Sequence, residues 1–390
     1  MSSRSNGVWR RSRLWWRRLL VMTVKELLQL SRDTALILFM VYAFTLDIYL
    51  SGSGTTFELM KAAIFVSDAD HSRSSRELAQ QFMPPSFELK GELRHPSEGM
   101  RLLDENQAMG ILSIPPRFHE LLQKGEPTSV QLQIDATNTV LGTLAGLYGM
   151  RIVADYGFEA AMERMGWDER TLEHVPRIED APRVWFNQNQ NDTWFMSIAE
   201  MLNIITLFAI MLPAAAMVRE KEKGTVEQLL VSPLTPFQIM FPKVVAMAIA
   251  IVAGTGLCVG VILKGCFNVP MRGSVTLFLA LTGLYVFATA GLGLFIATMS
   301  RNLGQASMMA IVSYAPMIFL SGAWTPPEAM PRFMQWTMVL SPLHYYIDVS
   351  FGIFLKGATF WSPWYSVLCI GLFGSILFSL GIWRLRRQVS

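Results

Sequence analysis

The stretch MVREKEKGTVEQLLVSPLTP, from Met217 to Pro236, decides the fold of this chain. Residues 193–216, which precede it, contain a single charged side chain, that of Glu200. A helix of roughly 20 predominantly apolar residues is long enough to cross the hydrocarbon core of a bilayer. The sequence therefore predicts a membrane helix over residues 193–218 that runs directly into the charged residues 219–223.

The charged run is followed by a second, shorter helical pattern. Gly224 allows the first helix to end or turn sharply, because glycine readily adopts the left-handed conformation. Thr225 and Gln228 have the spacing of a capping box, which starts a new helix at residues 225–231, and Pro233 lies just beyond its end. A connection between two spans needs only a few residues, so an ordered helix with an apolar and a charged face indicates a docking surface. The alternative is a loop helix that rests on the lipid.

The composition of the whole chain agrees with a membrane location. Of its 390 residues, 52% are apolar and only 16% are charged, which is unusual for a soluble protein of this size. The formal net charge of +3 gives no reason to expect nucleic acid as a partner. The three cysteines lie in or beside apolar runs without a CxxC or Cys/His spacing, so neither a disulfide framework nor a zinc site is indicated.

Six segments are long and apolar enough to be predicted as membrane helices, one before residue 52 and five within residues 193–390. They are residues 34–51, 193–218, 243–263, 274–298, 305–323 and 362–383. Before the third, Thr235 and Gln238 form another capping box, with Pro236 at the first helical position. Basic residues gather beside one set of span ends, which the positive-inside rule assigns to the cytoplasm. Both termini are therefore predicted to be cytoplasmic.

Residues 1–33 are predicted to form an amphipathic helix in the plane of the cytoplasmic membrane surface. Basic side chains recur every seven residues along one stripe, and tryptophan and leucine side chains occupy the opposite stripe. The basic residues of this stripe are Arg11, Arg18, Lys25 and Arg32. Such a pattern is typical of a helix that lies among lipid headgroups. The alternative is a basic flank without a defined fold.

The segment 52–192, between the first two spans, has ordinary polarity and is long enough to bury a core of its own. Strand patterns such as KAAIFVS and SVQLQID alternate with helical patterns such as SRSSRELAQQF, which predicts an extracytoplasmic α/β domain. Within it, the sequence SDADH, from Ser67 to His71, contains two carboxylates and an imidazole. A polar turn that caps the next helix is favoured over a metal site, because no second ligand group has a recognisable spacing.

Three polar residues inside the predicted spans are candidates for a substrate pathway: Asp47 in the first span, and Glu200 and Asn203 in the second. A charged side chain at the bilayer centre costs about 3 kcal/mol on insertion scales, so its presence suggests that it faces a pathway or another subunit. The alternative is a carboxylate that reaches water, since Asp47 and Glu200 lie toward the outer boundary. No catalytic or metal-binding residues are predicted, because no nucleophile with a base and no ligand cluster stands out.

The stretch REKEKGTVEQLLVSPL resembles the signature of the membrane subunits of type-two ABC transporters, in which Arg/Lys-Glu precedes Gly-Thr-x-Glu-x-Leu-Leu and Ser/Thr-Pro. The matching residues are Arg219, Glu220, Gly224, Thr225, Glu227, Leu229, Leu230, Ser232 and Pro233. Residues 324–348 are similar to the outer re-entrant segment of this family. The DATN turn at Asp135–Asn138 resembles that of bacterial multidrug-efflux permeases with a large external domain between spans one and two. The polar start of span two, WFMSIAEMLN, departs from the family pattern.

This resemblance implies a division of labour between chains. In the family, the cytoplasmic helix between spans two and three fits a cleft on a separate ATPase, and two membrane subunits face each other around one pathway. The residues implied in coupling to the ATPase are Arg219, Glu220, Gly224, Thr225, Glu227, Gln228, Leu229, Leu230 and Pro233. The sequence has no G-x-x-x-x-G-K-[ST] motif, so we expect the partner to bind ATP and Mg²⁺, and this chain to carry no cofactor and no enzyme activity.

The expected protein is a six-span α-helical permease of the bacterial cytoplasmic membrane, surrounded by lipids and paired with a second copy or a similar permease. A periplasmic adaptor is a further candidate partner. The expected cargo is a small, drug-like amphipathic molecule that leaves the cytoplasm or the inner leaflet. Two other interpretations stay open: an exporter of lipid or glycan precursors, and a non-transporting transmitter that couples cytoplasmic ATP hydrolysis to an envelope partner.

Overall fold

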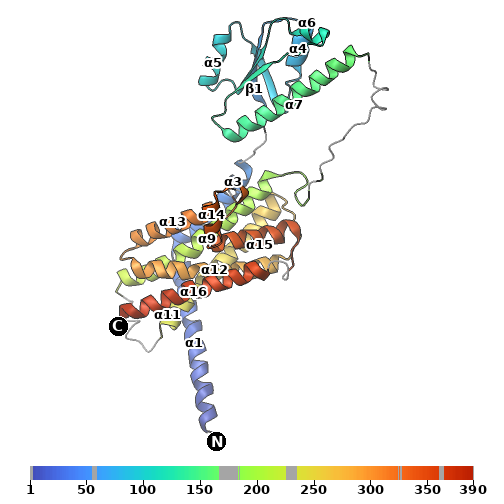
Figure 1. Ribbon diagram of the computed structural model, residues 1–390. Coiled ribbons are helices and arrows are strands. Elements are labelled where there is room, and N and C mark those ends of the chain that lie inside the picture. The colour runs from blue at the N-terminus through green and yellow to red at the C-terminus, as the bar shows by residue number, and fades with distance from the viewer. Residues whose placement is uncertain are drawn as a thin grey trace. The chain divides into compact units, whose positions relative to one another are not determined.

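The computed structural model describes residues 3–54, 59–166, 183, 185–224, 235–323, 325, 327–359 and 364–389. The chain forms two compact units (Figure 1). One is helical and joins Met1–Thr55 to Arg183–Ser390, and the other, Thr56–Pro182, contains a four-stranded sheet. Each unit has its own hydrophobic core.

The helical unit consists mainly of long apolar helices. In chain order its elements are α1 (Ser3–Ser31), α2 (Thr34–Tyr42), the π-helix η1 (Ala43–Asp47), α3 (Ile48–Gly54), α9 (Asp192–Glu222), α11 (Pro236–Cys258), the π-helix η2 (Val259–Cys266), α12 (Val275–Met299), α13 (Leu303–Phe319), the 3₁₀-helix η3 (Pro327–Ala329), α14 (Arg332–Met338), α15 (Pro342–Lys356) and α16 (Trp364–Val389). Figure 1 shows α1 extending from the same end of this unit at which α16 finishes.

Five helical segments are long and apolar enough to cross a membrane. They are Thr34–Gly54, Asp192–Glu222, Pro236–Cys266, Val275–Met299 and Trp364–Arg384. The predicted fifth span corresponds to α13, which is apolar but has 17 residues, fewer than the roughly 20 that a perpendicular crossing requires. In the region predicted to be re-entrant, α14 and α15 meet at 79° and together form either a sixth, broken span or a re-entrant loop. The described residues therefore hold five to six candidate spans, in agreement with a multi-pass helical membrane protein.

Local sequence signals determine where α9 ends and α11 begins. At the start of α11, Gln238 N donates to Thr235 Oγ1 at 3.3 Å and Thr235 N donates to Gln238 Oε1 at 3.1 Å, which is the predicted capping box. α9 ends at Glu222, and Gly224 has a φ of +66°, a conformation that glycine adopts without strain. The charged residues 219–222 therefore form the last turn of α9, so this helix is about one turn longer than the predicted span.

α9 is the central helix of this unit, because most of its side chains from Ser197 to Val218 are buried. α12 crosses it in backbone contact: a Cβ atom placed on Gly293 would lie 2.1 Å from the carbonyl oxygen of Ile210. α12 also meets α16, where a Cβ atom on Gly291 would lie 2.6 Å from the amide nitrogen of Phe378. Both glycines therefore permit the close approach of helices that small residues allow in membrane proteins.

Hydroxyl groups pair with each other inside the apolar core. The Thr206 hydroxyl of α9 lies 2.9 Å from that of Tyr285 on α12, and the Thr282 hydroxyl of α12 lies 2.7 Å from that of Tyr346 on α15. The rings of Tyr285 and Tyr346 stack with centroids 4.0 Å apart. A tyrosine can be buried in such a place only if its hydroxyl finds a partner, so these pairs fix α9, α12 and α15 against one another.

The second unit is a sheet with strand order β2-β1-β3-β4. Its elements are β1 (Ala62–Asp68), α4 (Arg73–Gln80), β2 (Phe87–Glu92), α5 (Pro96–Asp104), β3 (Gly110–Ile114), α6 (Phe118–Lys124), β4 (Gln131–Ile134) and α7 (Thr139–Arg164). β1 is parallel to β2 and β3, whereas β4 is antiparallel to β3. Buried strand residues such as Ile64, Val66 and Leu112 pack with Phe82 and Phe87. The alternation of strands and helices is the one that the sequence pattern predicts.

Candidate functional site

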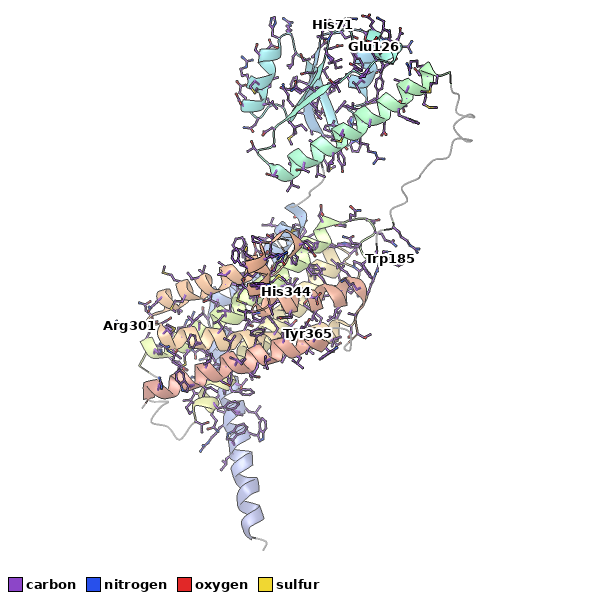
Figure 2. The ribbon with its side chains drawn as sticks, in the orientation of Figure 1. His71, Glu126, Trp185, Arg301, His344 and Tyr365 are labelled. Atoms are coloured by element: carbon purple, nitrogen blue, oxygen red, sulfur yellow. The ribbon has the colours of Figure 1, made fainter. Side chains whose placement is uncertain are left out.

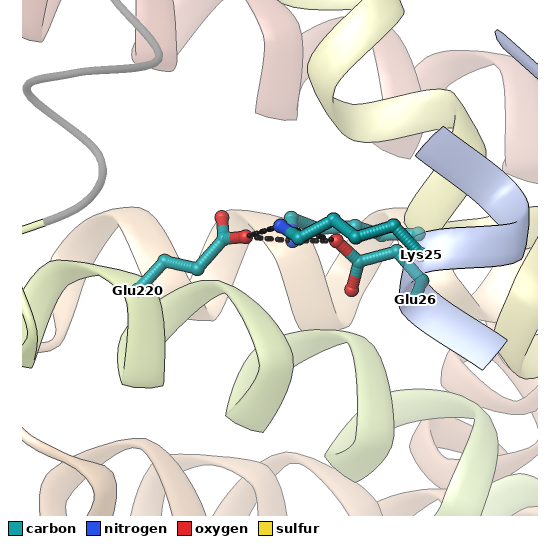
Figure 3. A network of polar contacts seen from close by, with 4 residues as sticks. Lys25, Glu26 and Glu220 are labelled. Atoms are coloured by element: carbon teal, nitrogen blue, oxygen red, sulfur yellow. Dashed lines mark hydrogen bonds and ion pairs between the residues drawn. The ribbon is translucent and has the colours of Figure 1, made fainter. Parts of the chain in front are cut away.

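Charged side chains from three helices meet beside the last turn of α9. They are Lys25 and Glu26 of α1, Glu220 of α9 and Lys243 of α11, and we call them the junction cluster. The Lys243 ammonium lies 2.7 Å from Glu26 Oε1 and 2.8 Å from Glu220 Oε1. Lys25 and Glu26 point from α1 toward Glu220, and Lys25 Nζ reaches Glu220 Oε1 at 2.8 Å (Figure 3). Two carboxylates therefore share two ammonium groups.

The junction cluster is largely removed from solvent. The side chain of Lys243 is 0% exposed and that of Glu26 is 2% exposed, whereas Lys25 is 45% exposed. Removing one partner of a buried ion pair typically costs about 3–5 kcal/mol, because the other charge is left buried and uncompensated. An exposed pair contributes about 1 kcal/mol or less. The cluster therefore depends most on Lys243 and least on Lys25.

A second ion pair lies next to the cluster, between Arg219 of α9 and Asp33. Asp33 is the N-cap of α2, and its Oδ1 also accepts a hydrogen bond from Leu36 N at 3.2 Å. The Arg219 hydrogen bond, assisted by that of Leu36, lowers the pKa of Asp33. At Lys25, burial acts to lower the pKa, but the hydrogen bond and charge of Glu220 outweigh it, so the pKa is raised. Both shifts favour the charged forms that make the ion pairs.

The next two residues of α9 bind neighbouring helices. Lys221 Nζ donates to the carbonyl oxygen of Ala297 at 2.6 Å, at the end of α12. Glu222 accepts a hydrogen bond from the amide of Leu303 at 2.8 Å, at the start of α13. The turn between α12 and α13, which carries Arg301, lies at this end of the helical unit (Figure 2). The last turn of α9 is thus attached to α1, α2, α11, α12 and α13.

A surface hollow of about 660 Å³ lies beside the junction cluster. Its lining residues are Lys25, Leu28, Gln29, Arg32, Asp33, Thr34, Arg219 and Lys223. Cationic side chains outnumber the single carboxylate in this lining, so the hollow favours an acidic binding partner.

The structure describes part of the predicted coupling site. Arg219 and Glu220 take part in the ion pairs, and Gly224 forms the left-handed turn after α9. The other predicted coupling residues, Thr225, Glu227, Gln228, Leu229, Leu230 and Pro233, and the predicted helix at 225–231 lie outside the described residues. The described chain resumes at Thr235, the N-cap of α11. The junction cluster therefore brings together the helices on both sides of the segment 225–234.

The three predicted pathway residues lie in the two helical segments that the sequence assigned to them. Glu200 and Asn203 are on α9, where Asn203 Nδ2 donates to Glu200 Oε2 at 3.3 Å. Asn203 is 2% exposed, and its Oδ1 has no hydrogen-bond partner among the described residues. Asp47 is the last residue of the π-helix η1. Glu200 and Asp47 are half-buried.

Sequence reasoning missed the contribution of α1 to the junction cluster. It assigned Lys25 to a basic stripe at the membrane surface and gave Glu26 no role. In the structure, Leu19, Glu26 and Leu30 form the buried face of α1, whereas Trp16 and Leu20 are exposed. The signal available in the sequence was Glu26, an acidic residue within a basic helix, because such a carboxylate suggests a cationic partner elsewhere in the chain.

The cap of α4 lies one residue beyond the SDADH turn, because Ser72 is the N-cap and its side chain accepts a hydrogen bond from Ser75 N. Asp68 Oδ1 accepts hydrogen bonds from Asp70 N at 2.9 Å and His71 N at 3.0 Å, and Asp68 Oδ2 accepts one from Ser75 Oγ. The sequence did not indicate Glu92, whose Oε1 lies 3.4 Å from His71 Nδ1. Asp68, His71 and Glu92 each place a potential metal-ligand atom within 4.8 Å of the others. Because Asp68 already accepts three hydrogen bonds, we assign it the role of ordering the turn before α4. His71, in the same turn, is labelled in Figure 2.

Comparison with known proteins extends over both units. Residues 34–383 match the model of the ABC-2 family transporter protein. The chain is 31% identical over 367 residues to the inner membrane transport permease YhhJ of Escherichia coli (strain K12), covering 94% of this chain and 96% of YhhJ. It is 29% identical over 356 residues to the probable multidrug ABC transporter permease YbhR of the same organism, covering 90% of this chain and 93% of YbhR. With ABC transporter G family member 20 of Dictyostelium discoideum it shares 22% identity over 269 residues, 67% of this chain and 36% of that protein.

Proposed function

Because this chain belongs to the ABC-2 family of transporter proteins, we propose that it is the membrane-spanning subunit of an ATP-driven exporter. A multi-pass transporter permease, which is not itself an enzyme, follows from the family. The proposal adds that a separate cytoplasmic ATPase binds ATP and Mg²⁺ and drives this chain. It also adds that the exported molecule is small and amphipathic, in line with the name of the probable multidrug permease YbhR.

The observation that carries the proposal is the junction cluster. Glu220 precedes the segment 225–234 and Lys243 follows it, and both pair within a site that also includes Glu26 of α1. An ATPase that pushed on this segment would therefore move α1, α9 and α11 together. The buried ion pairs support such a role because a rigid joint transmits a displacement that a flexible loop would absorb.

The ATPase is proposed to dock on the segment 225–234 and on the basic hollow beside the last turn of α9. Lys25, Arg32 and Lys223 supply positive charge at the hollow. Charge complementarity of this kind accelerates association and sets the orientation of a partner. The coupling residues proposed from the family signature include the acidic side chain of Glu227 and the apolar side chains of Leu229 and Leu230.

The membrane arrangement proposed for the chain places both termini and the junction cluster in the cytoplasm of a bacterium. The α/β unit would then lie on the outer side of the cytoplasmic membrane. Arg301 lies at the same end of the helical unit as the last turn of α9, which agrees with the positive-inside rule for that orientation (Figure 2). A second copy of this chain or a similar permease would complete the pathway, and a periplasmic adaptor would bind the outer unit.

Export by the complex can be tested in inverted membrane vesicles that contain this chain and the ABC ATPase that co-purifies with it. We expect ATP-dependent accumulation of the amphipathic dye ethidium. Leu229→Asp should abolish accumulation and weaken co-purification of the ATPase. The control Leu147→Asp introduces the same charge at a side chain of α7, in the α/β unit, that is 56% exposed, and should leave both unchanged.

Three outcomes would contradict the proposal. Normal accumulation and co-purification by Leu229→Asp would remove the coupling role of the segment. Movement of a fluorescent phospholipid without movement of ethidium would favour a lipid exporter. If the ATPase co-purified with the chain but the complex transported neither probe, a transmitter that acts through the α/β unit would be favoured.

A further inference from the structure

Two carboxylates inside the candidate spans have no cationic partner. Glu200 of α9 and Asp47 of η1 form no ion pair with any Lys, Arg or His side chain in the described part of the chain. Both are half-buried, and the helix α9 and the π-helix η1 that carry them pack against each other. An ionisable side chain within a membrane helix is expensive to keep there, so it usually has a partner or a function.

Asn203, one turn after Glu200, indicates which kind of chemical group would bind beside these carboxylates. Its amide nitrogen donates to Glu200 Oε2 at 3.3 Å, whereas its amide oxygen has no donor among the described residues, although the side chain is 2% exposed. Buried side-chain oxygens nearly always accept a hydrogen bond, because an unsatisfied one loses its hydration without compensation. The site therefore offers an acceptor that a hydrogen-bond donor would satisfy.

An aromatic ring and an irregular helix complete this site. Tyr314 lies on α13, a helix that packs against α9, and its side chain is partly buried against the main core. The face of a tyrosine ring attracts organic cations. Asp47 ends the π-helix η1, and π-helical turns within α-helices occur frequently at functional sites. Two negative charges, an unsatisfied acceptor and a ring face are thus contributed by three separate elements.

We propose that Asp47, Glu200 and Asn203, which we call the acceptor set, recognise a protonated amine on the exported molecule. The inference rests on the export function proposed above and narrows its substrate class to cationic amphipathic amines. The ammonium group donates N–H hydrogen bonds to Asn203 Oδ1 and to the Glu200 carboxylate, Asp47 adds to the negative potential, and Tyr314 offers its ring face. The apolar body of the substrate lies against the membrane helices.

The composition of the acceptor set distinguishes an amine from a metal ion. Ca²⁺ takes about six to eight oxygen ligands in a compact shell. Here the oxygens come from two carboxylates on different helices and one amide, and an aromatic ring replaces further ligands. Such a spread of charge and apolar surface suits an organic cation better than a compact inorganic one.

The test compares dansylcadaverine, an amphipathic primary amine, with its N-acetyl derivative, which has nearly the same shape but no charge. Binding to the full-length chain with its ATPase, in lipid nanodiscs without nucleotide, is measured by fluorescence polarisation. We expect the amine to bind at least tenfold more tightly than the acetylated probe. Glu200→Gln should weaken binding of the amine about tenfold and that of the acetylated probe less than twofold. Asn203→Leu and Asp47→Asn should each weaken binding of the amine about threefold.

A matched control and a second assay separate this inference from the export function. Asp348→Asn removes a carboxylate that is exposed on α15, and it should bind both probes like the wild type. Equal affinity for the two probes, no saturable binding of the amine, or unchanged binding by all three acceptor-set variants would overturn the inference. ATP-dependent accumulation is then measured in proteoliposomes with both probes. If the amine bound in a Glu200-dependent way but neither probe accumulated, export would be refuted and the recognition site would stand. If both probes accumulated equally, export would stand and recognition of the amine would be refuted.

Discussion

Two groups of acidic side chains in the helical unit differ in what balances their charge. In the junction cluster, Glu26 and Glu220 lie 2.7 Å and 2.8 Å from the ammonium of Lys243. In the acceptor set, the described polar partner of Glu200 is the neutral amide of Asn203, at 3.3 Å. The first group is electrostatically complete within the protein, so it fixes helices in place. The second leaves negative charge and an acceptor oxygen without a described partner, which is the basis of the recognition role proposed for it.

The largest loss of stability is expected when the buried ammonium of the junction cluster is removed. Lys243→Met leaves Glu26 and Glu220 beside each other with little solvent, and we expect a loss of about 3–5 kcal/mol in stability. The measurement is the thermal unfolding midpoint of the purified chain in detergent. Lys223→Met, at an exposed lysine beside the hollow, is the control and should stay near the wild-type midpoint. If the two variants unfolded at the same temperature, the cluster would not stabilise the helices.

A pair of isosteric substitutions tests the two groups directly. Glu220→Gln weakens charged hydrogen bonds to Lys243 and Lys25 and should cost about 1.5–3 kcal/mol. Glu200→Gln removes a charge that has no cationic partner among the described residues, so its unfolding midpoint should be equal to or higher than that of the wild type. Loss of stability in Glu200→Gln comparable to that in Glu220→Gln would contradict the distinction.

Lys25 should contribute less than Lys243, because its side chain is 45% exposed. Lys25→Met is expected to cost about 1 kcal/mol or less. Burial acts to lower the pKa of Lys25, but its hydrogen bond to Glu220 and the charges of Glu220 and Glu26 together outweigh burial, so the pKa is raised in the fold. Its stabilisation is therefore fully present below the unfolded pKa of about 10.4 and is lost as the pH rises through the higher folded pKa. Unfolding midpoints of wild type and variant should converge over that alkaline range, and a constant difference would refute the assignment.

The smallest effect is expected at the Asp33–Arg219 pair. Asp33→Asn keeps the N-cap oxygen of α2 but removes the charge, so the expected loss at neutral pH is about 0.2–1 kcal/mol. Arg219 lowers the pKa of Asp33. The stabilisation is therefore present above the unfolded pKa of about 3.9 and disappears as the pH falls through the lower folded pKa. Chemical denaturation should show a smaller difference between variant and wild type at about pH 3 than at pH 7, and an equal difference at both would contradict the assignment.

Local signals in the sequence predicted the helix boundaries near the junction. The apolar run before Arg219 predicted α9, and the Thr235 capping box with Pro236 predicted the start of α11. Both signals are short-range, because they depend on hydropathy and on hydrogen bonds between residues three apart. The prediction ended span two at residue 218 because charged residues follow. The structure continues the helix to Glu222, since each of those charges has a partner on another helix.

Long-range partners could not be predicted in the same way. The hydrogen bond between Lys243 and Glu26 joins residues separated by 217 positions, and nothing in either local pattern specifies the other. Glu92 was missed beside His71 for the same reason. The acceptor set is an intermediate case: the cost of a charge in a span predicted Glu200, Asn203 and Asp47 as candidates, but only the fold shows that Asn203 is buried with an unsatisfied oxygen.

The glycine at position 293 has a consequence for how the helical unit can move. Since the backbones of α9 and α12 touch there, no deformable side-chain layer lies between them. A tilt applied at the charged tip of α9 is therefore passed on to α12 as rigid-body motion. We expect any opening to occur on the flank of α9 that faces α13, which is a shorter helix containing Pro316 and which carries Tyr314. The contact between α9 and α13 would then be both the place where the helices separate and the place where the substrate is proposed to bind.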